Sequence, residues 1–317
     1  MVPRPEKLTS PGVLRLGIGL AALGRPAYIT LGRAADLADH RTPDAMQRRT
    51  HEVLDAAWEA GVRYVDCARS YGYAERFVGA WLAEHPGRRD ALVIGSKWGY
   101  AYVGQWDPTA DPQEVKEHSA AMFDRQWPET LDALGGPPDL YDVHSMTPGD
   151  PALTDPQILA RMADLAASGV RVGFSTSGPG QATTIRQALA LEHGPYTSVQ
   201  STWNLLEPSA GPALADAQRA GWFVVVKEAL ANGRLTGRGD ERAVRMAQAD
   251  DQAPDAHAIA WALAQPFADV VLSGAVTVPQ LVSNLAARPP ATPARDVATL
   301  ARPPEQYWAE RSALPWL

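Results

Sequence analysis

Short apolar runs alternate with longer amphipathic stretches along almost the whole chain. The runs rich in β-branched and aromatic residues predict strands at residues 14–19, 64–66, 91–98, 140–144, 170–174, 197–200, 222–227 and 270–272. Helical periodicity follows each of them, at residues 43–60, 74–85, 112–134, 156–168, 181–192, 213–220, 256–264 and 279–287. Strand and helix therefore alternate from one end of the chain to the other.

Capping residues support the ends of two of these helices. Thr42 is a suitable N-cap for the helix at 43–60, with Pro43 at its first position and Gly61 after its last. For the long helix at 112–134, we expect Asp111 as the cap and Glu114 at the capping-box position.

Eight strand–helix pairs predict a parallel sheet with right-handed crossovers, and eight units suit a closed (β/α)8 barrel. We therefore expect an α/β fold of one domain over residues 1–317, with long active-site loops and a C-terminal tail at 301–317. The alternative is a doubly wound open sheet with G-x-G-x-x-G after an early strand. Residues 17–22, GIGLAA, lack the third glycine and precede no helix start, which argues against it.

Composition narrows the possible partners and compartment. The formal net charge is −7 and the pI about 5.5, so there is no basic excess for nucleic-acid binding. Cys67 is the only cysteine, which excludes an intrachain disulfide and a thiolate metal cluster. The N-terminus has no apolar signal core, and no apolar run reaches about 18 residues. We expect a soluble cytoplasmic protein without a metal or membrane partner, and the oligomeric state is not predicted.

Polar residues stand at the C-terminal ends of three consecutive predicted strands. These are Asp66, Lys97 and His144, and Tyr71 lies in the loop after the second strand. Each alone also has a structural explanation: an Asp66–Lys97 ion pair, a core histidine, a packed tyrosine. In a barrel, however, all of them meet at the C-terminal mouth, where active sites are built.

Together these four side chains suit proton transfer to or from an oxygen atom. A phenol has a reference pKa of about 10, and a buried ammonium beside it favours the phenolate. A carboxylate holds the ammonium, and an imidazole can orient a carbonyl by a hydrogen bond to its oxygen. The set contains no obvious nucleophile, which makes covalent catalysis less natural.

Residues 61–79, GVRYVDCARSYGYAERFVG, resemble the hallmark segment of the aldo-keto reductase family. The resemblance implies a (β/α)8 enzyme that reduces carbonyls, or oxidises alcohols and lactols, with a nicotinamide dinucleotide. It implies that Tyr71 is the general acid/base, that Lys97 and Asp66 tune it, and that His144 orients the substrate. The substrate would be a small carbonyl or alcohol compound: an aldehyde, a ketone or a sugar.

Later segments resemble the family's cofactor-binding segments in the same order. Ser175 and Thr176 stand where the family has a Ser-Asn pair for the nicotinamide amide, and Gln200 precedes an aromatic-Asn-Leu run, WNLL, at 203–206. Residues 229–235, with Leu230 and Gly233, occupy the pyrophosphate loop. The adenosine-side segment, 273–284, contributes Gly274, Thr277, Gln280 and Asn284. Its helix N-terminus is a suitable anion site in its own right.

The chain departs from the family pattern at several of these positions. Thr176 replaces Asn, and Lys227 stands where many members place an aromatic residue that stacks on the nicotinamide. Lys227 could lie along that ring, reach the pyrophosphate, or pair with Glu228.

Gly274 and Val278 fall where NADPH-preferring members carry a Lys and an Arg, although Arg234 or Arg238 could substitute. The family's habit slightly favours NADP(H) over NAD(H), and the sequence leaves this choice open.

Aromatic residues after the third strand are candidates for the substrate wall. Trp98, Tyr100 and Trp106 suit sugars, steroids and aryl ketones equally well. The long connection at 20–42 and the C-terminal tail could cover the site or only pack against the barrel.

Two other functions remain for a barrel of this kind: a nicotinamide-binding sensor or regulatory barrel with little turnover, and a lyase or epimerase without net redox change. A sensor has no need of all four polar residues, and the cofactor segments argue against a lyase.

Overall fold

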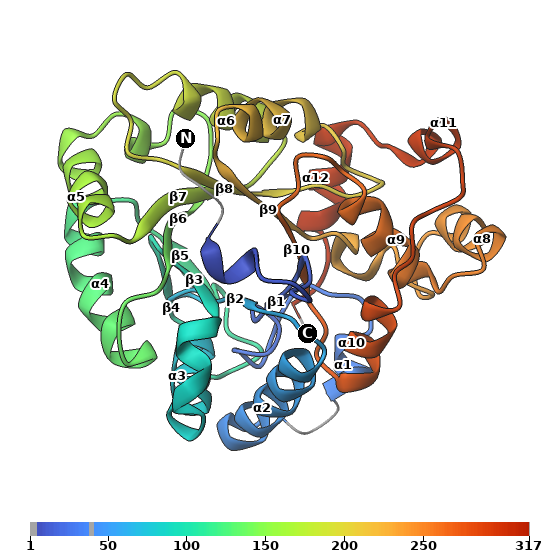
Figure 1. The fold of residues 1–317 in the computed structure, drawn as a ribbon, viewed down its shortest axis with the longest axis horizontal. Helices are drawn as coiled ribbons and strands as arrows, with labels where there is room; N and C mark the ends of the chain where they lie inside the picture. Colours follow the sequence, from blue (N-terminus) through green and yellow to red (C-terminus); the bar gives the residue numbers. More distant parts are fainter. Residues whose placement is uncertain (1–4, 38–40, 317) are drawn as a thin grey trace.

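Parallel strands close into a barrel in the order β1-β10-β9-β8-β7-β6-β3-β2 (Figure 1). The computed structural model describes residues 5–37 and 41–316, and within these ranges the barrel has eight strands. They are β1 Leu16–Gly19, β2 Tyr64–Asp66, β3 Val93–Trp98, β6 Leu140–Met146, β7 Arg171–Thr176, β8 Ser198–Thr202, β9 Phe223–Lys227 and β10 Val270–Ser273. The predicted (β/α)8 barrel is confirmed. Residues 1–4, part of the connection predicted at 20–42, and the last residue of the predicted tail lie outside the described residues.

The helices surround the barrel as an outer ring (Figure 1). Those that follow the barrel strands are α2 Pro43–Glu59, α3 Ala74–Glu84, α4 Ala120–Leu134, α5 Pro156–Ala167, α6 Gln181–Leu189, α7 Gly211–Arg219, α9 Pro254–Leu263 and α10 Val278–Leu285. Thr42 caps α2 as expected, since its hydroxyl accepts a hydrogen bond from the Ala45 amide. Further helices occupy stretches without a predicted element: α1 Arg33–Leu37, α8 Glu241–Ala249, α11 Ala294–Val297 and α12 Pro304–Ser312. Short 3-10 turns lie at Glu6–Leu8, Pro86–Ala91, Pro151–Leu153, Ala231–Gly233 and Ala298–Leu300.

Successive side chains along each strand point alternately into and out of the barrel. In the layer of the barrel interior farther from the C-terminal strand ends, the inward side chains are apolar and form one cluster with Leu8. They are Tyr64, Val93, Leu140, Phe223, Val225, Val270 and Leu272. Their neighbours along the strands, such as Ile94 and Tyr141, belong to the separate core between barrel and helices. The same alternation continues upward and sets which polar side chains face the mouth.

The predicted helix at 112–134 is wrong in its first part. Residues Glu114–Lys116 form strand β5, which pairs antiparallel with β4, Tyr100–Tyr102. Helix α4 begins only at Ala120, and the Ser119 hydroxyl caps it by accepting from the Met122 amide at 3.0 Å. Asp111 and Glu114 are therefore not capping residues. The local capping pattern is overridden because the backbone at 113–117 bonds instead to the segment after β3, for example Glu117 N to the Gly99 oxygen at 2.9 Å.

Two negative findings concern the part of the chain that the structure describes. Its helices include none both long and apolar enough to cross a membrane. Its His, Cys, Asp and Glu side chains form no group of three or more arranged to hold a metal ion.

Candidate active site

The C-terminal ends of the barrel strands open into a cavity of about 610 Å³. Its wall reaches from the loops after β2 and β6 to the N-terminal turns of α10. It includes most of the residues singled out in the sequence: Asp66, Tyr71, Tyr100, His144, Ser175, Gln200, Lys227, Leu230, Gly233, Gly274, Gln280 and Asn284. Trp98, Trp106, Thr176 and Thr277 lie outside this lining, and Lys97 lies directly behind it.

A buried ion pair forms the floor beneath the proposed proton donor. Lys97 and Asp66 are 1% and 3% exposed, and the Lys97 ammonium donates to both Asp66 carboxylate oxygens at 2.7 Å. Its third acceptor is the Cys67 carbonyl oxygen at 3.0 Å. Gln200 also donates to Asp66, at 2.7 Å. These contacts satisfy all three hydrogens of the ammonium and fix it in one place.

Tyr71 lies between this ion pair and His144. The Lys97 nitrogen is 4.9 Å from the centre of the Tyr71 ring. The Tyr71 hydroxyl lies 3.5 Å from Nε2 of His144, and the two rings meet edge to face at 5.3 Å. Ser70 Oγ lies 3.2 Å from the other imidazole nitrogen, Nδ1. The structure thus brings together the four side chains that the sequence placed at one mouth.

Electrostatics at Tyr71 differ from the sequence expectation. Burial, followed by the charge of Asp66, raises the pKa of Tyr71 well above its ordinary value, against the opposing effect of Arg25. Any lowering by the Lys97 ammonium is outweighed, so the phenol keeps its proton at neutral pH. Burial also lowers the pKa of His144 well below its usual range, with Lys97 and Lys227 adding to the effect. The imidazole is therefore neutral.

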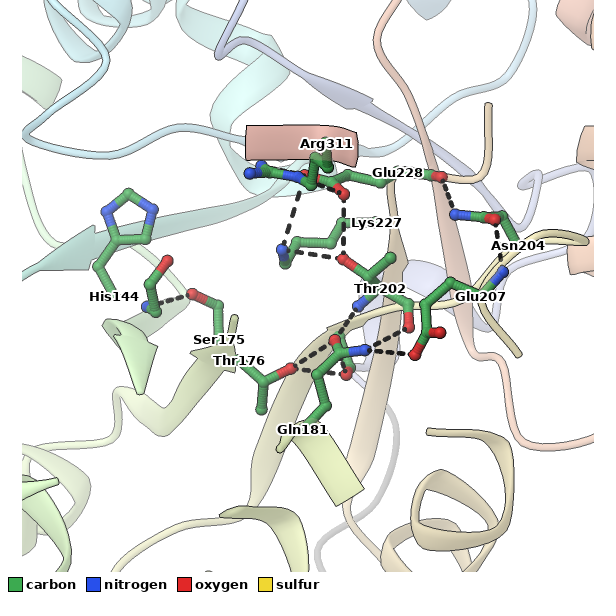
Figure 2. A network of polar contacts seen from close by, with 12 residues as sticks. His144, Ser175, Thr176, Gln181, Thr202, Asn204, Glu207, Lys227, Glu228 and Arg311 are labelled. Carbon is green, nitrogen blue, oxygen red and sulfur yellow. Dashed lines mark hydrogen bonds and ion pairs between the residues drawn. The ribbon is translucent and has the colours of Figure 1, made fainter. Parts of the chain in front are cut away.

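His144 sits at an irregular point of its strand. The register between β6 and β7 shifts between Val143 and Met146, and Ser145 has a positive φ of 56°. Ser175 fixes the bulge from β7, because its hydroxyl accepts from the Ser145 amide at 2.8 Å (Figure 2). His118 fixes it from the other side, with Nε2 2.8 Å from the His144 carbonyl oxygen and Nδ1 2.6 Å from Asp150.

Thr176 points away from the cavity, because it follows the inward-facing Ser175 on the strand. Its hydroxyl lies 2.6 Å from Ser201 Oγ and 3.0 Å from Gln181 Oε1 (Figure 2). Gln181, at the start of α6, also accepts from the Thr202 amide at 2.9 Å. Thr176 therefore joins β7 to β8 and α6, and its effect on a nicotinamide would be indirect.

Lys227 ends β9 with its ammonium in the cavity wall. It donates to Thr202 Oγ1 at 3.1 Å and lies 4.0 Å from Glu228, which in turn accepts three hydrogen bonds from Arg311 of α12 (Figure 2). Burial lowers the pKa of Lys227 to about 8, although Glu228 opposes this. Burial raises the pKa of Glu228, but Arg311 and Lys227 outweigh it and bring the value to about 2.

Arg25 organises the mouth beside Tyr71, and no sequence motif marks this residue. The guanidinium donates to the Ser70 carbonyl oxygen at 3.1 Å and to Glu114 at 2.7 Å. It also lies 5.1 Å from the ring centre of Tyr28 and 4.9 Å from that of Trp316. Arg25, Tyr28, Glu114 and Trp316 all line the cavity. The long connection after β1 and the C-terminal tail therefore meet here.

Of the three aromatic residues expected at the substrate wall, only Tyr100 lines the cavity, with its ring 5.0 Å from that of His144. Trp98 follows the inward-facing Lys97, so its ring points outward and packs 5.3 Å from Phe123. Trp106 stacks on Tyr73 at 4.6 Å.

The far end of the cavity is built by α10 and the loop after β9. Thr277 caps α10 by accepting from the Gln280 amide at 3.3 Å, and Asn284 donates to Ser273 Oγ at 2.8 Å. The side-chain oxygens of Asn284 and Asn232 are buried and have no hydrogen-bond partner among the described residues. Both residues line the cavity, so these acceptors are available to a bound molecule.

Comparisons with known proteins give similarities in sequence and in fold. The sequence model described as "Aldo/keto reductase family" matches residues 15–302. An aldo-keto reductase of Strobilurus tenacellus is 28% identical over 191 residues, which cover 59% of this chain and only 52% of that protein. Pyridoxal 4-dehydrogenase of Microbacterium luteolum is 29% identical over 262 residues, 73% of this chain and 71% of that protein.

A solved structure shares the fold. The glycerol dehydrogenase of Gluconobacter oxydans superimposes with a TM-score of 0.70 at 19% sequence identity, covering 98% of this chain and 95% of that one. At this sequence identity, the comparison shows only that the two proteins share the fold, that is, the barrel and its surrounding helices.

Proposed function

The chain belongs to the aldo/keto reductase family, and from this premise we propose that it catalyses NAD(P)-dependent hydride transfer between nicotinamide and the carbonyl or alcohol carbon of a small substrate. The observation that carries the proposal is the buried Lys97–Asp66 pair beneath Tyr71, with His144 beside the same phenol. Both Tyr71 and His144 face the cavity.

Tyr71 is the proton donor in the reducing direction. A buried phenol with a raised pKa is protonated at neutral pH, and its hydroxyl faces the cavity. As the carbonyl becomes an alcohol, its oxygen develops negative charge and takes this proton. The fixed ammonium of Lys97 then stabilises the phenolate that Tyr71 becomes.

His144 orients the substrate oxygen. When the Ser70 hydroxyl donates to Nδ1, the neutral imidazole carries its hydrogen on Nε2, on the side of Tyr71. That hydrogen can then bind the same oxygen that Tyr71 protonates.

A nicotinamide dinucleotide, which supplies or takes up the hydride when bound, fits the remaining wall. Ser175 and Gln200 would hold the nicotinamide amide, with Lys227 nearby. Leu230 and Gly233 would lie along the pyrophosphate, and Gly274, Gln280 and Asn284 would bind the adenosine. The unpartnered oxygens of Asn232 and Asn284 support this assignment. Thr176 and Thr277 would act by holding strands and helix in place.

On the substrate side, the wall combines aromatic rings with paired charges. Tyr28, Tyr100 and Trp316 lie beside the pairs Arg25–Glu114 and Glu228–Arg311. This favours an aldehyde, ketone or sugar that carries further polar groups over an extended hydrocarbon.

The test follows reduced-nicotinamide absorbance with a panel of aldehydes, ketones and sugars. For the best substrate, Tyr71→Phe should lower kcat by about 10²- to 10⁴-fold, since general acid catalysis contributes that much, with the Kd of the cofactor changed less than about twofold. Tyr73→Phe is the matched control, because Tyr73 packs on Trp106 outside the cavity lining. Full activity in Tyr71→Phe would refute the proton role, and absence of dinucleotide binding would refute the function.

A further inference from the structure

We propose that this chain selects NAD(H) over NADP(H), with Asp36 and Asp255 as the residues that reject a 2′-phosphate. The inference rests on the proposed function, because it concerns the far end of the cavity assigned to the adenosine. Both carboxylates line that cavity, together with Arg238 and Gln280.

The arginine at this end of the cavity, Arg238, is already paired with Asp36. Arg238 donates to both Asp36 carboxylate oxygens, at 2.7 and 2.9 Å, and Gln280 of α10 donates to Asp36 at 2.8 Å. The side chain of Asp36 is 13% exposed. A phosphate could bind Arg238 only by displacing this two-bonded carboxylate or by sharing the guanidinium with it.

The carboxylate of Asp36 is ionised at neutral pH. The hydrogen bond with Arg238 is the largest influence and lowers the pKa of Asp36. Burial opposes it, and the Gln280 hydrogen bond and the charges of Arg238 and Arg49 add to the lowering. Asp36 therefore presents negative charge, with acceptor capacity left over for hydroxyl groups.

Asp255 adds a second carboxylate to the same wall. It lies in the first turn of α9, and its side chain makes no hydrogen bond or ion pair with the residues that the structure describes. Among the cavity-lining groups at this end, Asp36, Asp255 and Arg238 carry a formal charge of −1 before any ligand binds; Arg49, whose charge also acts on Asp36, lies outside the lining. A 2′-phosphate brings about −2 more.

The N-terminus of α10 offers only partial compensation. A helix N-terminus carries roughly half of an elementary charge, which is less than the surplus carboxylate. The residues of α10, VPQLVSNL, include no Lys or Arg. Gly274 contributes no side chain, and a Cβ placed there would meet open space. A ribose with a free 2′-hydroxyl, in contrast, donates a hydrogen bond that a carboxylate accepts.

The loop that carries Asp36 is attached to this end of the cavity at a second point. The Leu31 amide donates to the Asn232 carbonyl oxygen at 3.0 Å. Leu31 and Asn232 also line the cavity, so the bridge from Asp36 to Gln280 and Arg238 lies along its wall and not on a distant surface.

Binding of NADH and NADPH to the full chain, measured by isothermal titration calorimetry at fixed ionic strength, tests the proposal. We expect the Kd of NADPH to exceed that of NADH by at least about tenfold, as one unfavourable charge contact predicts. Asp36→Asn should lower the Kd of NADPH by at least about tenfold, because it removes a negative charge and frees Arg238. The Kd of NADH should stay the same or rise.

Asp124→Asn is the matched control. Asp124 also pairs with an arginine by two hydrogen bonds, to Arg161 at 2.7 and 2.6 Å, but on the outer helices α4 and α5. Both Kd values should be unchanged in this variant.

Asp255→Asn tests the same charge without breaking the Asp36 bridge, so it stays informative if Asp36→Asn disturbs the loop. It should also reduce the ratio of the Kd of NADPH to the Kd of NADH. Equal or tighter binding of NADPH by the unmodified chain overturns the proposal, as does an unchanged ratio in both variants. Binding of neither dinucleotide would instead refute the proposed function.

Discussion

Lys97 acts on Tyr71 through space and not through a hydrogen bond. Its three hydrogens are taken by the two Asp66 oxygens and the Cys67 carbonyl, while its charge lies 4.9 Å from the phenol ring centre. Such an ammonium leaves the phenol free to donate toward the cavity. In the proposed mechanism, the attraction between this ammonium and Tyr71 is strongest when the phenol has lost its proton, which is the state that the proposed proton transfer produces.

Lys227 should control the pH dependence of carbonyl reduction. Its pKa of about 8 means that the ammonium is lost as the pH rises through that value, whereas Tyr71 stays protonated there. The charge of Lys227 acts as far as His144, whose pKa it helps to lower. Since negative charge develops on the substrate oxygen, kcat should fall severalfold between about pH 7 and 9. Rates measured across this range with saturating cofactor give the profile.

Two substitutions make this prediction specific. Lys227→Arg keeps a cation above pH 9 and should shift the fall to higher pH. Lys227→Met should lower kcat near neutral pH and abolish the decrease of kcat at higher pH. An unchanged alkaline limb in Lys227→Met would show that another group titrates.

Asp142 should make the fold less stable as the pH rises. It is buried inside the barrel, and burial raises its pKa to about 7 against the opposing charge of Lys97. The folded value lies above the unfolded value of 3.8, so the stabilising contribution is complete below about pH 4 and is lost as the pH rises to about 7.

Asp142→Asn keeps a neutral side chain at every pH. Its free energy of unfolding should exceed that of the unmodified chain by about 2–4 kcal/mol near pH 8 and by less near pH 5. Urea denaturation at both pH values measures this, with the exposed Asp90→Asn as control. A gain that does not grow with pH would contradict the titration of Asp142.

At the scale of elements, the β4–β5 hairpin connects the mouth to His144, the proposed substrate-orienting residue. It carries Tyr100 and Glu114 into the cavity wall, and Lys116 donates to the Ser145 carbonyl oxygen at 3.1 Å. His118 follows directly and contacts the His144 carbonyl oxygen. The hairpin therefore holds the bulge of β6 from one side, while Ser175 of β7 holds it from the other.

His118→Phe should lower kcat severalfold while leaving the Kd of the dinucleotide unchanged. The phenyl ring of the variant fills a similar space, but the contacts of His118 to Asp150 and to the His144 carbonyl oxygen are lost. The imidazole of His144 is therefore held less firmly. Leaving buried acceptors unpaired should also cost about 1–3 kcal/mol of stability. Steady-state kinetics and denaturation measure the two effects.

Ser119→Ala is the control for this position. Loss of the α4 cap should cost about 1 kcal/mol without changing kcat. If the two variants lose kcat in proportion to their loss of stability, His118 has only a structural role.

At the scale of the whole molecule, distant parts of the chain close the substrate side. Tyr28 of the connection after β1 and Trp316 of the tail pack edge to face at 6.1 Å, with Arg25 against both rings. Arg311 of α12 binds Glu228 next to Lys227. The mouth is therefore assembled from the first loop and the last helix of the described chain.

Trp316→Ala should raise the KM of the substrate severalfold and change kcat less than about twofold. The ring makes one cation–π contact, with Arg25, and one aromatic contact, with Tyr28, each worth about 1 kcal/mol, and neither contact is with Tyr71 or His144. Kinetics with the best substrate measure the split. Leu314→Ala, in the same tail but outside the cavity lining, is the control. A selective loss of kcat would place Trp316 closer to the chemistry than proposed.

The alternation of elements was enough to predict the barrel, and the strand ends were enough to place Asp66, Lys97 and His144 at one mouth. The two-residue period of a strand also predicts the direction of the side chains next to Lys97 and Ser175. Lys97 and Ser175 face the interior of the barrel. Trp98 and Thr176 follow them directly along the chain, so this period predicts that both point away from the cavity.

Other features depended on contacts between distant segments. The sequence around Glu114 has a local helix pattern, and only its pairing with the strand after β3 makes it a strand. Arg25, His118 and Asp36 carry no motif, since each acts through partners between 26 and 244 positions away along the chain. Local periodicity sets the elements because it reflects backbone geometry within a few residues. Side-chain charge and hydrogen bonding at a cavity depend on which loops meet there, and that is decided only when the barrel closes.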